Sequence, residues 1–231
     1  MAVITQRLLE QHQPLPKIQV LIYPWLQMAN MHTHSAMFYR DQSMLTPTKI
    51  SFAKFILWYL GINDVTDEML DALESHNHTI VIKDFEKYKK YWDVNKIPEE
   101  FKNGLSYYDE YEKRKELYPK NHLHDSNILV KDKNLNSLVQ KLVDKDISPL
   151  LADSKYLIGL PKAYFLVLEW DTLKDEGLLY AERLKEAGVD VQLAFYDKAF
   201  HGIATMVDDS FGFEIAKLMR TDLIDYLKRN L

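Results

Sequence analysis

The residues of this chain that could do acid–base chemistry follow two predicted β-strands. Asp171 comes just after the apolar run Ala163–Glu169, and His201 comes shortly after the run Val189–Tyr196. A helical pattern that ends at Gly188 joins the two runs, so the sequence predicts parallel strands. Because ligands collect at the carboxyl ends of such strands, we expect Asp171 and His201 to meet at one edge of the sheet. A carboxylate that orients an imidazole base forms two parts of a hydrolase triad.

Both residues also have an ordinary structural explanation. Asp171 could cap the helix that follows it, and His201 could be a histidine of a turn. Asp175 and Glu176 fit the start of the same helix, where the helix dipole favours negative charge, so we assign them no catalysis. The position of Asp171 and His201 after successive strands, together with the motifs around them, favours the catalytic interpretation.

These motifs resemble one enzyme family. They are Gln19-Val-Leu-Ile-Tyr-Pro, Ser148-Pro-Leu-Leu-Ala-Asp, Asp171-x-Leu-x-Asp-Glu-Gly and, after a strand, His201-Gly. In this order they resemble the C-terminal portion of α/β-hydrolases of the hormone-sensitive-lipase branch, and within it the arylacetamide deacetylase-like esterases. The resemblance covers most of the chain. It implies a hydrolase of small acyl esters or amides that needs no cofactor, in which His201 is the general base and Asp171 orients it.

The nucleophile that this family uses is not found in the sequence. A nucleophile elbow has the pattern Gly-x-Ser-x-Gly, and no two of the seven glycines lie four residues apart. The His-Gly-Gly oxyanion loop is absent as well. Ser148 lies in a family-like motif, but its Ser-Pro context predicts a turn. We therefore expect the chain to be inactive alone, with an upstream Ser completing the enzyme. The alternative is a non-catalytic, hydrolase-derived binding or regulatory protein, or a truncated isoform.

The composition excludes several other classes of protein. The chain has 231 residues, 47% of them hydrophobic, which suffices for one domain with a sizeable core. A net charge of −5 argues against non-specific nucleic-acid binding. The absence of cysteine excludes disulfides and thiolate metal sites. We expect no metal site either, and we interpret three His-x-His pairs as surface histidines: His32/His34, His76/His78 and His122/His124.

The pattern of apolar residues predicts an incomplete α/β-hydrolase domain over residues 1–231. Its strands are expected at 18–24, 163–169 and 190–196, with a first helix at 1–12 and a closing helix at 209–231. Residues 27–145 contain no predicted strand, and we interpret them as a helical cap or lid inserted into the domain. The cap is expected to hold a loop at 26–45 and helices at 46–61, 66–75, 84–92 and 108–117. Three aromatic residues of the cap could line an acyl pocket, but core packing explains them better: Trp58, Tyr59 and Trp92.

Two expectations concern partners and location. With few strands beside it, strand 18–24 would present an unpaired apolar edge, so we expect self-association or a partner there. No apolar run reaches the ~18 residues that a membrane span needs, and the first residues do not resemble a signal peptide. The resemblance implies the endoplasmic reticulum membrane or lumen. In that compartment the sequon Asn77-His-Thr could carry a glycan.

Overall fold

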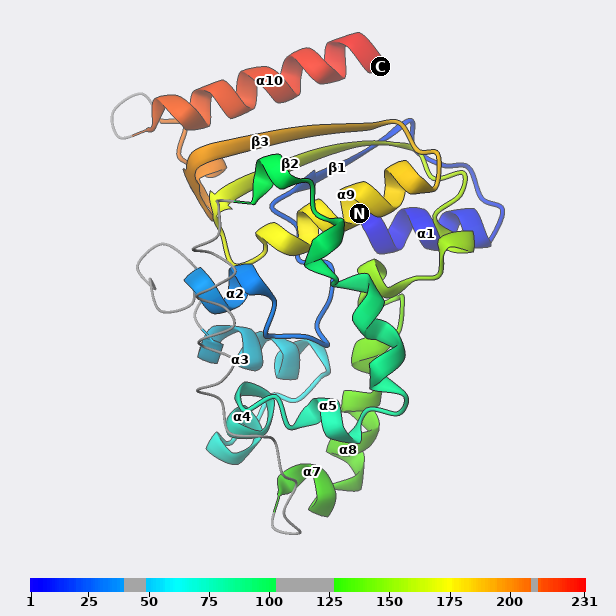
Figure 1. Ribbon diagram of the computed structural model, residues 1–231, viewed down its shortest axis with the longest axis vertical. Coiled ribbons are helices and arrows are strands. Elements are labelled where there is room, and N and C mark those ends of the chain that lie inside the picture. The colour runs from blue at the N-terminus through cyan, green and yellow to red at the C-terminus, as the bar shows by residue number, and fades with distance from the viewer. Residues whose placement is uncertain (40–48, 103–126, 209–211) are drawn as a thin grey trace.

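A sheet of three parallel strands forms the centre of the protein (Figure 1). The computed structural model describes residues 1–39, 49–102, 127–208 and 212–231. The strands are β1 (Ile18–Ile22), β2 (Lys162–Trp170) and β3 (Val191–Phe200), in the order β1-β2-β3. The chain thus has a partial α/β-hydrolase fold, as the sequence predicted. Strand β3 runs to Phe200, four residues past its predicted end, and His201 follows it directly.

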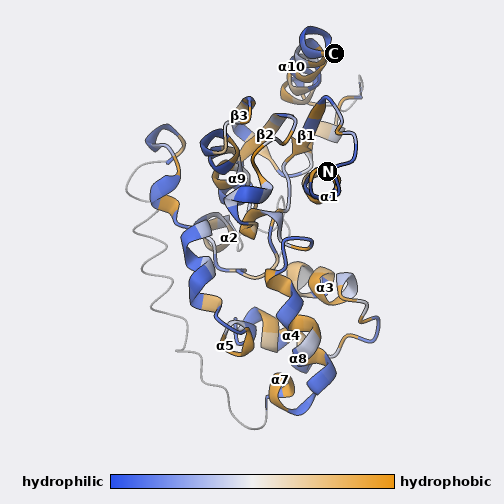
Figure 2. Cartoon of the chain, turned by 90° about the vertical axis from the view of Figure 1, so that its right-hand side faces the viewer, coloured by the Kyte–Doolittle hydropathy of each residue, from blue (hydrophilic) through white to orange (hydrophobic). Residues whose placement is uncertain are grey.

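Strand β2 is buried on both faces because helices cover the sheet from both sides. Its side chains alternate: Tyr164 and Leu166 face one layer, while Phe165 and Val167 face the other. The first layer is α10 (Glu214–Asn230), and the second holds α1 (Ala2–Glu10) and α9 (Lys174–Glu186) (Figure 1). In Figure 2, α10 carries both hydrophobic and hydrophilic residues, as expected of a helix with one packed side. Four apolar residues at helical spacing pack this helix against the sheet: Ile215, Met219, Leu223 and Leu227.

The segment between β1 and β2 is helical wherever the structure describes it as regular, and it extends away from the sheet (Figure 1). Its predicted helices at 66–75 and after Pro47 are present, although the exact start of the latter lies outside the described residues. The predicted helix at 108–117 also lies outside them. The described α-helices of this segment are α2 (His34–Tyr39), α3 (Lys49–Tyr59), α4 (Asp67–Glu74), α5 (His78–Val81), α7 (Ile128–Lys131) and α8 (Lys133–Gln140).

Short 3₁₀-helices complete the described structure. The segment predicted as a helix at 84–92 is one of them, and it begins after Asp84 in a left-handed conformation with φ 54°. The full set is η1 (Phe85–Tyr91), η2 (Val94–Lys96), η3 (Glu99–Phe101), η4 (Lys141–Val143), η5 (Pro149–Leu151), η6 (Ser154–Tyr156) and η7 (Ile203–Thr205).

Three interpretations of the cap sequence were wrong. Residues 26–45 were expected to form a loop, but they contain α2, which packs close to the start of α9. Trp58 and Tyr59 do not pack in the core, because they lie on the outer side of α3 and are 45% and 57% exposed. His78 is not a surface residue: it is fully buried, and its Nε2 lies 2.8 Å from the carbonyl oxygen of Ala29.

The histidines of the cap gather instead of facing solvent. The ring of His76 stacks on that of His32 at 4.1 Å and meets the ring of His78 edge-on at 4.9 Å. Sequence spacing could not show this, because His32 is far from the other two along the chain. The pair His122/His124 lies outside the described residues. Within the described ranges, no three His, Asp or Glu residues are arranged to hold a metal ion.

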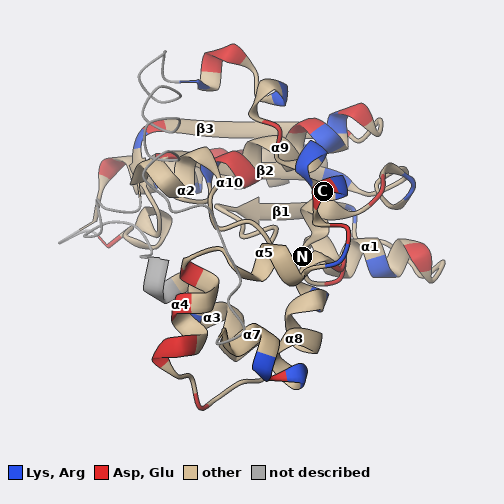
Figure 3. Cartoon of the chain, turned by 60° about the horizontal axis from the view of Figure 1, so that its bottom comes forward, with Lys and Arg blue, Asp and Glu red and all other residues tan. Residues whose placement is uncertain are grey.

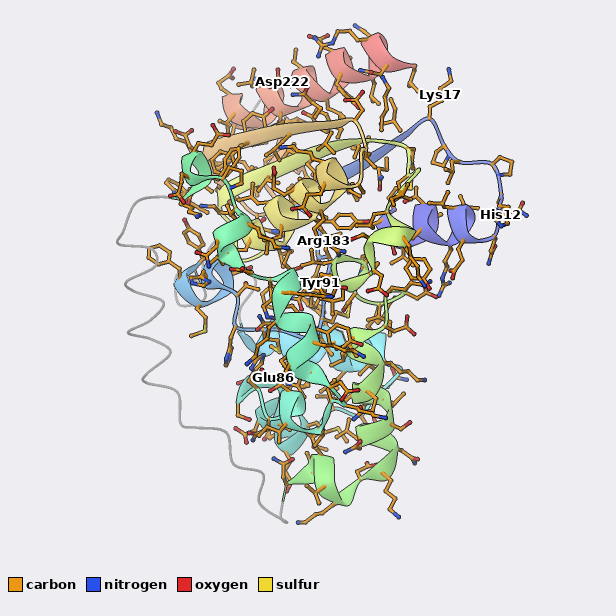
Figure 4. The ribbon with its side chains drawn as sticks, turned by 45° about the vertical axis from the view of Figure 1, so that its right-hand side comes forward. His12, Lys17, Glu86, Tyr91, Arg183 and Asp222 are labelled. Carbon is orange, nitrogen blue, oxygen red and sulfur yellow. The ribbon has the colours of Figure 1, made fainter. Side chains whose placement is uncertain are left out.

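A buried arginine attaches the cap to the layer below the sheet. Arg183 of α9 donates hydrogen bonds to the carbonyl oxygens of Leu150 and Ala152, and its guanidinium lies 4.3 Å from the ring centroid of Tyr91. Figure 4 shows Arg183 and Tyr91 close together between the sheet layer and the cap. Charges elsewhere are mixed in sign, as Figure 3 shows for the described helices. None of the described helices is both long and apolar enough to cross a membrane.

Candidate active site

The structure brings Asp171 and His201 into contact at the carboxyl end of the sheet. Asp171 follows β2 and His201 follows β3, and the two strands are hydrogen-bonded neighbours. Oδ2 of Asp171 lies 2.9 Å from Nδ1 of His201. A carboxylate in this position makes Nδ1 the protonated ring nitrogen, so that Nε2 carries the lone pair that a general base needs.

The imidazole of His201 lies between a buried carboxylate and an aromatic ring. The Asp171 side chain is 1% exposed and that of His201 is 25% exposed, so the ring is the part of the pair that solvent and ligands can reach. The ring of Tyr23, which follows β1, lies 4.7 Å from the imidazole at an angle of 57°. Gly202 then adopts φ +90°, a conformation that favours glycine, and turns the chain away from the sheet.

The two oxygens of the Asp171 carboxylate have different partners. While Oδ2 faces His201, Oδ1 accepts a hydrogen bond of 2.8 Å from the backbone N–H of Leu173. Asp171 therefore orders the turn into α9 and meets the imidazole at the same time. The N-cap residue of α9 is Leu173, so Asp171 does not cap the helix but orders the turn that leads into it.

A buried ion pair lies next to this turn. Nζ of Lys174 donates to both carboxylate oxygens of Glu169, at 2.9 and 2.8 Å, and both side chains are nearly inaccessible to solvent. The hydroxyl of Tyr39 in α2 also donates to this carboxylate. The pair therefore links the end of β2, the start of α9 and the beginning of the cap.

Asp175 connects α9 to α2 through a second set of bonds. Its carboxylate accepts a hydrogen bond of 2.7 Å from the backbone N–H of Ser35. The Ser35 hydroxyl donates to the carbonyl oxygen of Thr172 at 2.9 Å and accepts from the N–H of Asp175 at 3.2 Å. The turn between Asp171 and α9 is thus fixed from the side of the cap as well.

Glu176 connects α9 to the segment that follows β1. Its carboxylate accepts hydrogen bonds from the backbone N–H groups of Leu26 and Gln27, at 2.8 and 3.2 Å, and from the Gln27 side chain at 2.7 Å. Burial, with the nearby Asp171 charge as a smaller contribution, raises the pKa of Glu176 to about 8. The sequence places Asp175 and Glu176 in the first turn of α9 as expected, but it gives no sign of their distant partners.

Ser148 has a structural role. Its hydroxyl donates to the carbonyl oxygen of Leu142 at 2.6 Å and accepts from the backbone N–H of Met28 at 2.8 Å, and the side chain is fully buried. The expected turn forms here as η5. Ser148 therefore stabilises the packing of three segments in a position that a nucleophile could not occupy.

A small pocket adjoins the Asp171 turn on the side of the cap. Its walls are mostly apolar, and its polar lining includes Thr172, which follows Asp171, and Glu176. The apolar walls come from the segment after β1 and from α3: Trp25, Met28, Met31, Phe52 and Ile56. Of the aromatic residues proposed to line a pocket, none is among them. Trp92 packs against the core, as expected, while Trp58 and Tyr59 are exposed.

Sequence comparison relates the chain to a family of hydrolases. A family model described as "alpha/beta hydrolase fold" matches residues 107–205, which include Asp171 and His201. Arylacetamide deacetylase from Bos taurus is 30% identical over 233 residues, which is 100% of this chain and 51% of that protein. Neutral cholesterol ester hydrolase 1 from Bos taurus is 29% identical over 218 residues, which is 93% of this chain and 48% of that protein. The chain spans about half the length of the curated relatives that it matches.

Structure comparison shows the same fold in esterases. A carboxyl esterase from Tuber melanosporum has a TM-score of 0.53 at 16% identity, covering 97% of this chain and 47% of that one. An esterase from Rhizomucor miehei has a TM-score of 0.51 at 20% identity, covering 99% of this chain and 47% of that one. The parallel sheet and these comparisons show that the chain has part of the α/β-hydrolase fold, and its sequence is similar to arylacetamide deacetylase and neutral cholesterol ester hydrolase over at least 93% of its length.

Proposed function

We propose that this chain is the part of a serine-type carboxylic-ester or amide hydrolase that supplies the base and its orienting carboxylate. The observation that carries the proposal is the 2.9 Å contact between Asp171 Oδ2 and His201 Nδ1 at the carboxyl end of adjacent strands. The names of the relatives and of the structural neighbours support the reaction class.

In the proposed mechanism, Nε2 of His201 takes the proton of a serine hydroxyl as that oxygen attacks the ester or amide carbonyl. Asp171 keeps Nδ1 protonated and stabilises the imidazolium that forms. His201 then returns the proton to the leaving group, and a water molecule attacks the acyl-enzyme in the second half of the reaction. The serine and the oxyanion donors come from outside these 231 residues, because no Gly-x-Ser-x-Gly sequence occurs in them.

The apolar lining of the small pocket beside the Asp171 turn supports a substrate with an apolar acyl or aryl group. Its walls include Trp25, Phe52 and Ile56, and it opens next to the residue that follows the catalytic carboxylate. Arylacetamides and cholesterol esters, which appear in the relatives' names, both carry bulky apolar groups. We further propose that the complete protein works at the endoplasmic reticulum membrane or in its lumen, as the resemblance to the arylacetamide deacetylases implies.

A second function is favoured by one specific observation. The chain has no nucleophile elbow, and its one serine in a family-like motif, Ser148, is buried and hydrogen-bonded on both sides. If the chain acts as it stands, it is a non-catalytic protein that retains the hydrolase pocket. It would then bind apolar esters without turning them over.

A hydrolysis assay separates the two functions. The chain alone should hydrolyse a p-nitrophenyl acyl ester no faster than His201→Ala does. A fusion with the part of bovine arylacetamide deacetylase that lies outside the match should hydrolyse it. His201→Ala or Asp171→Asn should then lower the kcat of the fusion by about 10³-fold or more. If the fusion folds and its kcat is unchanged by both substitutions, the proposed hydrolase function is wrong. If the chain alone hydrolyses the ester and His201→Ala abolishes this activity, the chain does not need an added nucleophile.

A further inference from the structure

The first turn of α9 holds three consecutive charged side chains that are buried and that bind three different parts of the chain. Lys174 binds Glu169 of β2, Asp175 binds Ser35 of α2, and Glu176 binds the segment after β1. Burial of so many ionisable groups is costly unless each is paired, so their arrangement needs an explanation beyond the helix dipole.

We propose that Glu176 is a positioning residue for His201: it fixes the segment Tyr23–Gln27 against the Asp171 turn and so holds the imidazole between the Tyr23 ring and the Asp171 carboxylate. The inference rests on the proposed role of His201 as a base. Glu176 itself touches neither His201 nor the expected reacting atoms, and it acts through the segment that it binds.

The bonds of Glu176 fix the backbone of this segment at two successive residues. Oε2 accepts from the N–H groups of Leu26 and Gln27, and Oε1 accepts from the Gln27 side-chain amide. Oε1 of Gln27 in turn accepts from the N–H groups of Ala29 and Asn30, at 3.0 and 2.7 Å. The Glu176 carboxylate therefore orders a segment that lies beyond the end of β1, where the backbone no longer pairs with a neighbouring strand.

This stretch begins at the residue that contacts the imidazole. The N–H of Tyr23 makes the last bond to β2, at 2.8 Å from the carbonyl oxygen of Leu166. Tyr23 then turns with φ +32°, which is uncommon for a residue other than glycine. Three residues later the chain reaches the Glu176 carboxylate. Tyr23 is thus held by the sheet on one side and by Glu176 on the other, with its ring 4.7 Å from that of His201.

The connection between Glu176 and Asp171 is also short and rigid. Glu176 lies five residues after Asp171, whose carboxylate orders the turn into the same helix. The next residue is Gly177, and a Cβ placed there would lie 3.0 Å from Val167 of β2 and 3.9 Å from Pro24. Because α9 lies this close to the strand and to Pro24, little room is left for Glu176 to move relative to Asp171.

The test is the state of the His201 ring in the full chain, read by ¹H–¹⁵N NMR of the imidazole. In the unchanged protein we expect one tautomer, protonated at Nδ1, and a slowly exchanging Nδ1 proton. In Glu176→Gln the introduced side-chain NH₂ faces the Gln27 amide, which is itself a donor, so the bond between the two side chains is lost. We expect the Nδ1 proton of His201 to exchange about tenfold faster in this variant, and a second set of His201 ring signals to appear. Asp171→Asn marks complete loss of the interaction. Leu184→Ala is the matched control, because it removes fully buried packing from the same helix at a residue that makes none of the hydrogen bonds of Glu176.

An exchange of partners provides a rescue. In Gln27→Glu/Glu176→Gln the carboxyl group introduced at position 27 can accept from the side-chain amide introduced at position 176 and from the N–H groups of Ala29 and Asn30. In its protonated form it donates to the carbonyl oxygen of Asn30, as the Gln27 amide does. The oxygen of that introduced amide can accept from the N–H of Leu26. We expect this double variant to recover the single His201 tautomer. If Glu176→Gln does not fold, Tyr23→Leu tests the same link, because it removes the ring beside His201 and should likewise speed exchange.

Two results would overturn the inference: an unchanged His201 signal in folded Glu176→Gln and Tyr23→Leu, or an equal change in Leu184→Ala. None of these measurements involves hydrolysis. An inactive fusion protein would contradict the proposed function but not the positioning role of Glu176. An active fusion protein with an unchanged His201 signal in Glu176→Gln and Tyr23→Leu would contradict the positioning role alone.

Discussion

Asp171 and His201 are separated by 30 residues in the chain, yet Oδ2 of the first lies 2.9 Å from Nδ1 of the second. The contact follows from the parallel pairing of β2 and β3, which ends both strands at the same edge. Helix α9 and strand β3, with 13 and 10 residues, together account for most of the intervening residues. The order and direction of the strands therefore bring the two residues together. The protonation of the His201 ring can be measured in the chain without any substrate turnover.

Asp171→Asn is expected to change the tautomer of His201. Asparagine can present an N–H where the carboxylate presented an acceptor, which favours a lone pair on Nδ1 and a proton on Nε2. The change is read from the ¹⁵N shifts of the ring. Asp153→Asn, at an exposed aspartate that accepts a hydrogen bond from Tyr91, should leave the ring unchanged. A ring protonated at Nδ1 in Asp171→Asn would contradict the assigned hydrogen bond.

Lys174→Met is expected to destabilise the fold strongly. It leaves the Glu169 carboxylate buried without its cation, a change that typically costs ~3–5 kcal/mol. The double variant Lys174→Met/Glu169→Gln should cost less than the single one, because it also removes the uncompensated charge. Urea denaturation followed by circular dichroism measures both. Equal stability of the single variant and the unchanged protein would show that the pair is not buried as described.

Glu176 makes the stability of the fold depend on pH between about 5 and about 8. Burial raises its pKa to about 8 in the folded chain, against 4.5 as the ordinary value, so the folded state holds more protons between these limits. The unfolding free energy should therefore fall as pH rises from about 5 to about 8, by ~1.4 kcal/mol per unit from this group. Glu176→Gln should remove this part of the slope. An identical slope in the variant would assign the pH dependence to other groups.

His78 produces the opposite slope on the acidic side. Burial lowers the pKa of this histidine from 6.5 to about 4, so below pH 6.5 the unfolded chain takes up a proton that the folded chain does not. Its contribution to stability is complete above pH 6.5 and is lost as pH falls towards 4. His78→Gln keeps a donor for the carbonyl oxygen of Ala29, and its stability relative to that of the unchanged chain should be higher at about pH 5 than at about pH 7. Thermal melts at about pH 7 and about pH 5 provide the comparison.

The outer edge of β1 is expected to cause self-association. The N–H of Tyr23 bonds to β2, so by the alternation of a parallel ladder the backbone groups of Val20 and Ile22 point to the edge that no described strand covers. Ile22→Lys should reduce concentration-dependent association in sedimentation velocity. Ile158→Lys, which changes a more exposed isoleucine away from the sheet, should associate as the unchanged chain does. A chain that is monomeric at all concentrations would contradict this prediction.

The strands, the long helices and the meeting of Asp171 with His201 could be predicted because local patterns determine them. Apolar runs such as Ala163–Glu169 define buried strands, and parallel strands joined by one helix bring their carboxyl ends together. The family-like motifs strengthened the same interpretation. Here the local pattern and the global topology agree.

The partners of Lys174, Asp175 and Glu176 could not be predicted in this way. Their spacing fits an ordinary acidic helix start, and the groups that they bind lie at residues 26–39 and 169, on segments whose approach no local pattern describes. The same reason explains the histidines of the cap. His78 looks like a polar residue of a short helix, and only the tertiary packing shows that it is buried.

The distance in sequence between α9 and its partners has a consequence for the order of folding. The backbone bonds within helix α9 are local, but the bonds from Glu176 to Leu26 and from Asp175 to Ser35 close loops of about 150 and 140 residues. Contacts with such separation form late, because the entropy of closing the loop opposes them until the sheet has assembled. We therefore expect the amides of Leu26, Gln27 and Ser35 to gain protection from hydrogen exchange after those of β2, and to lose it first when the chain opens.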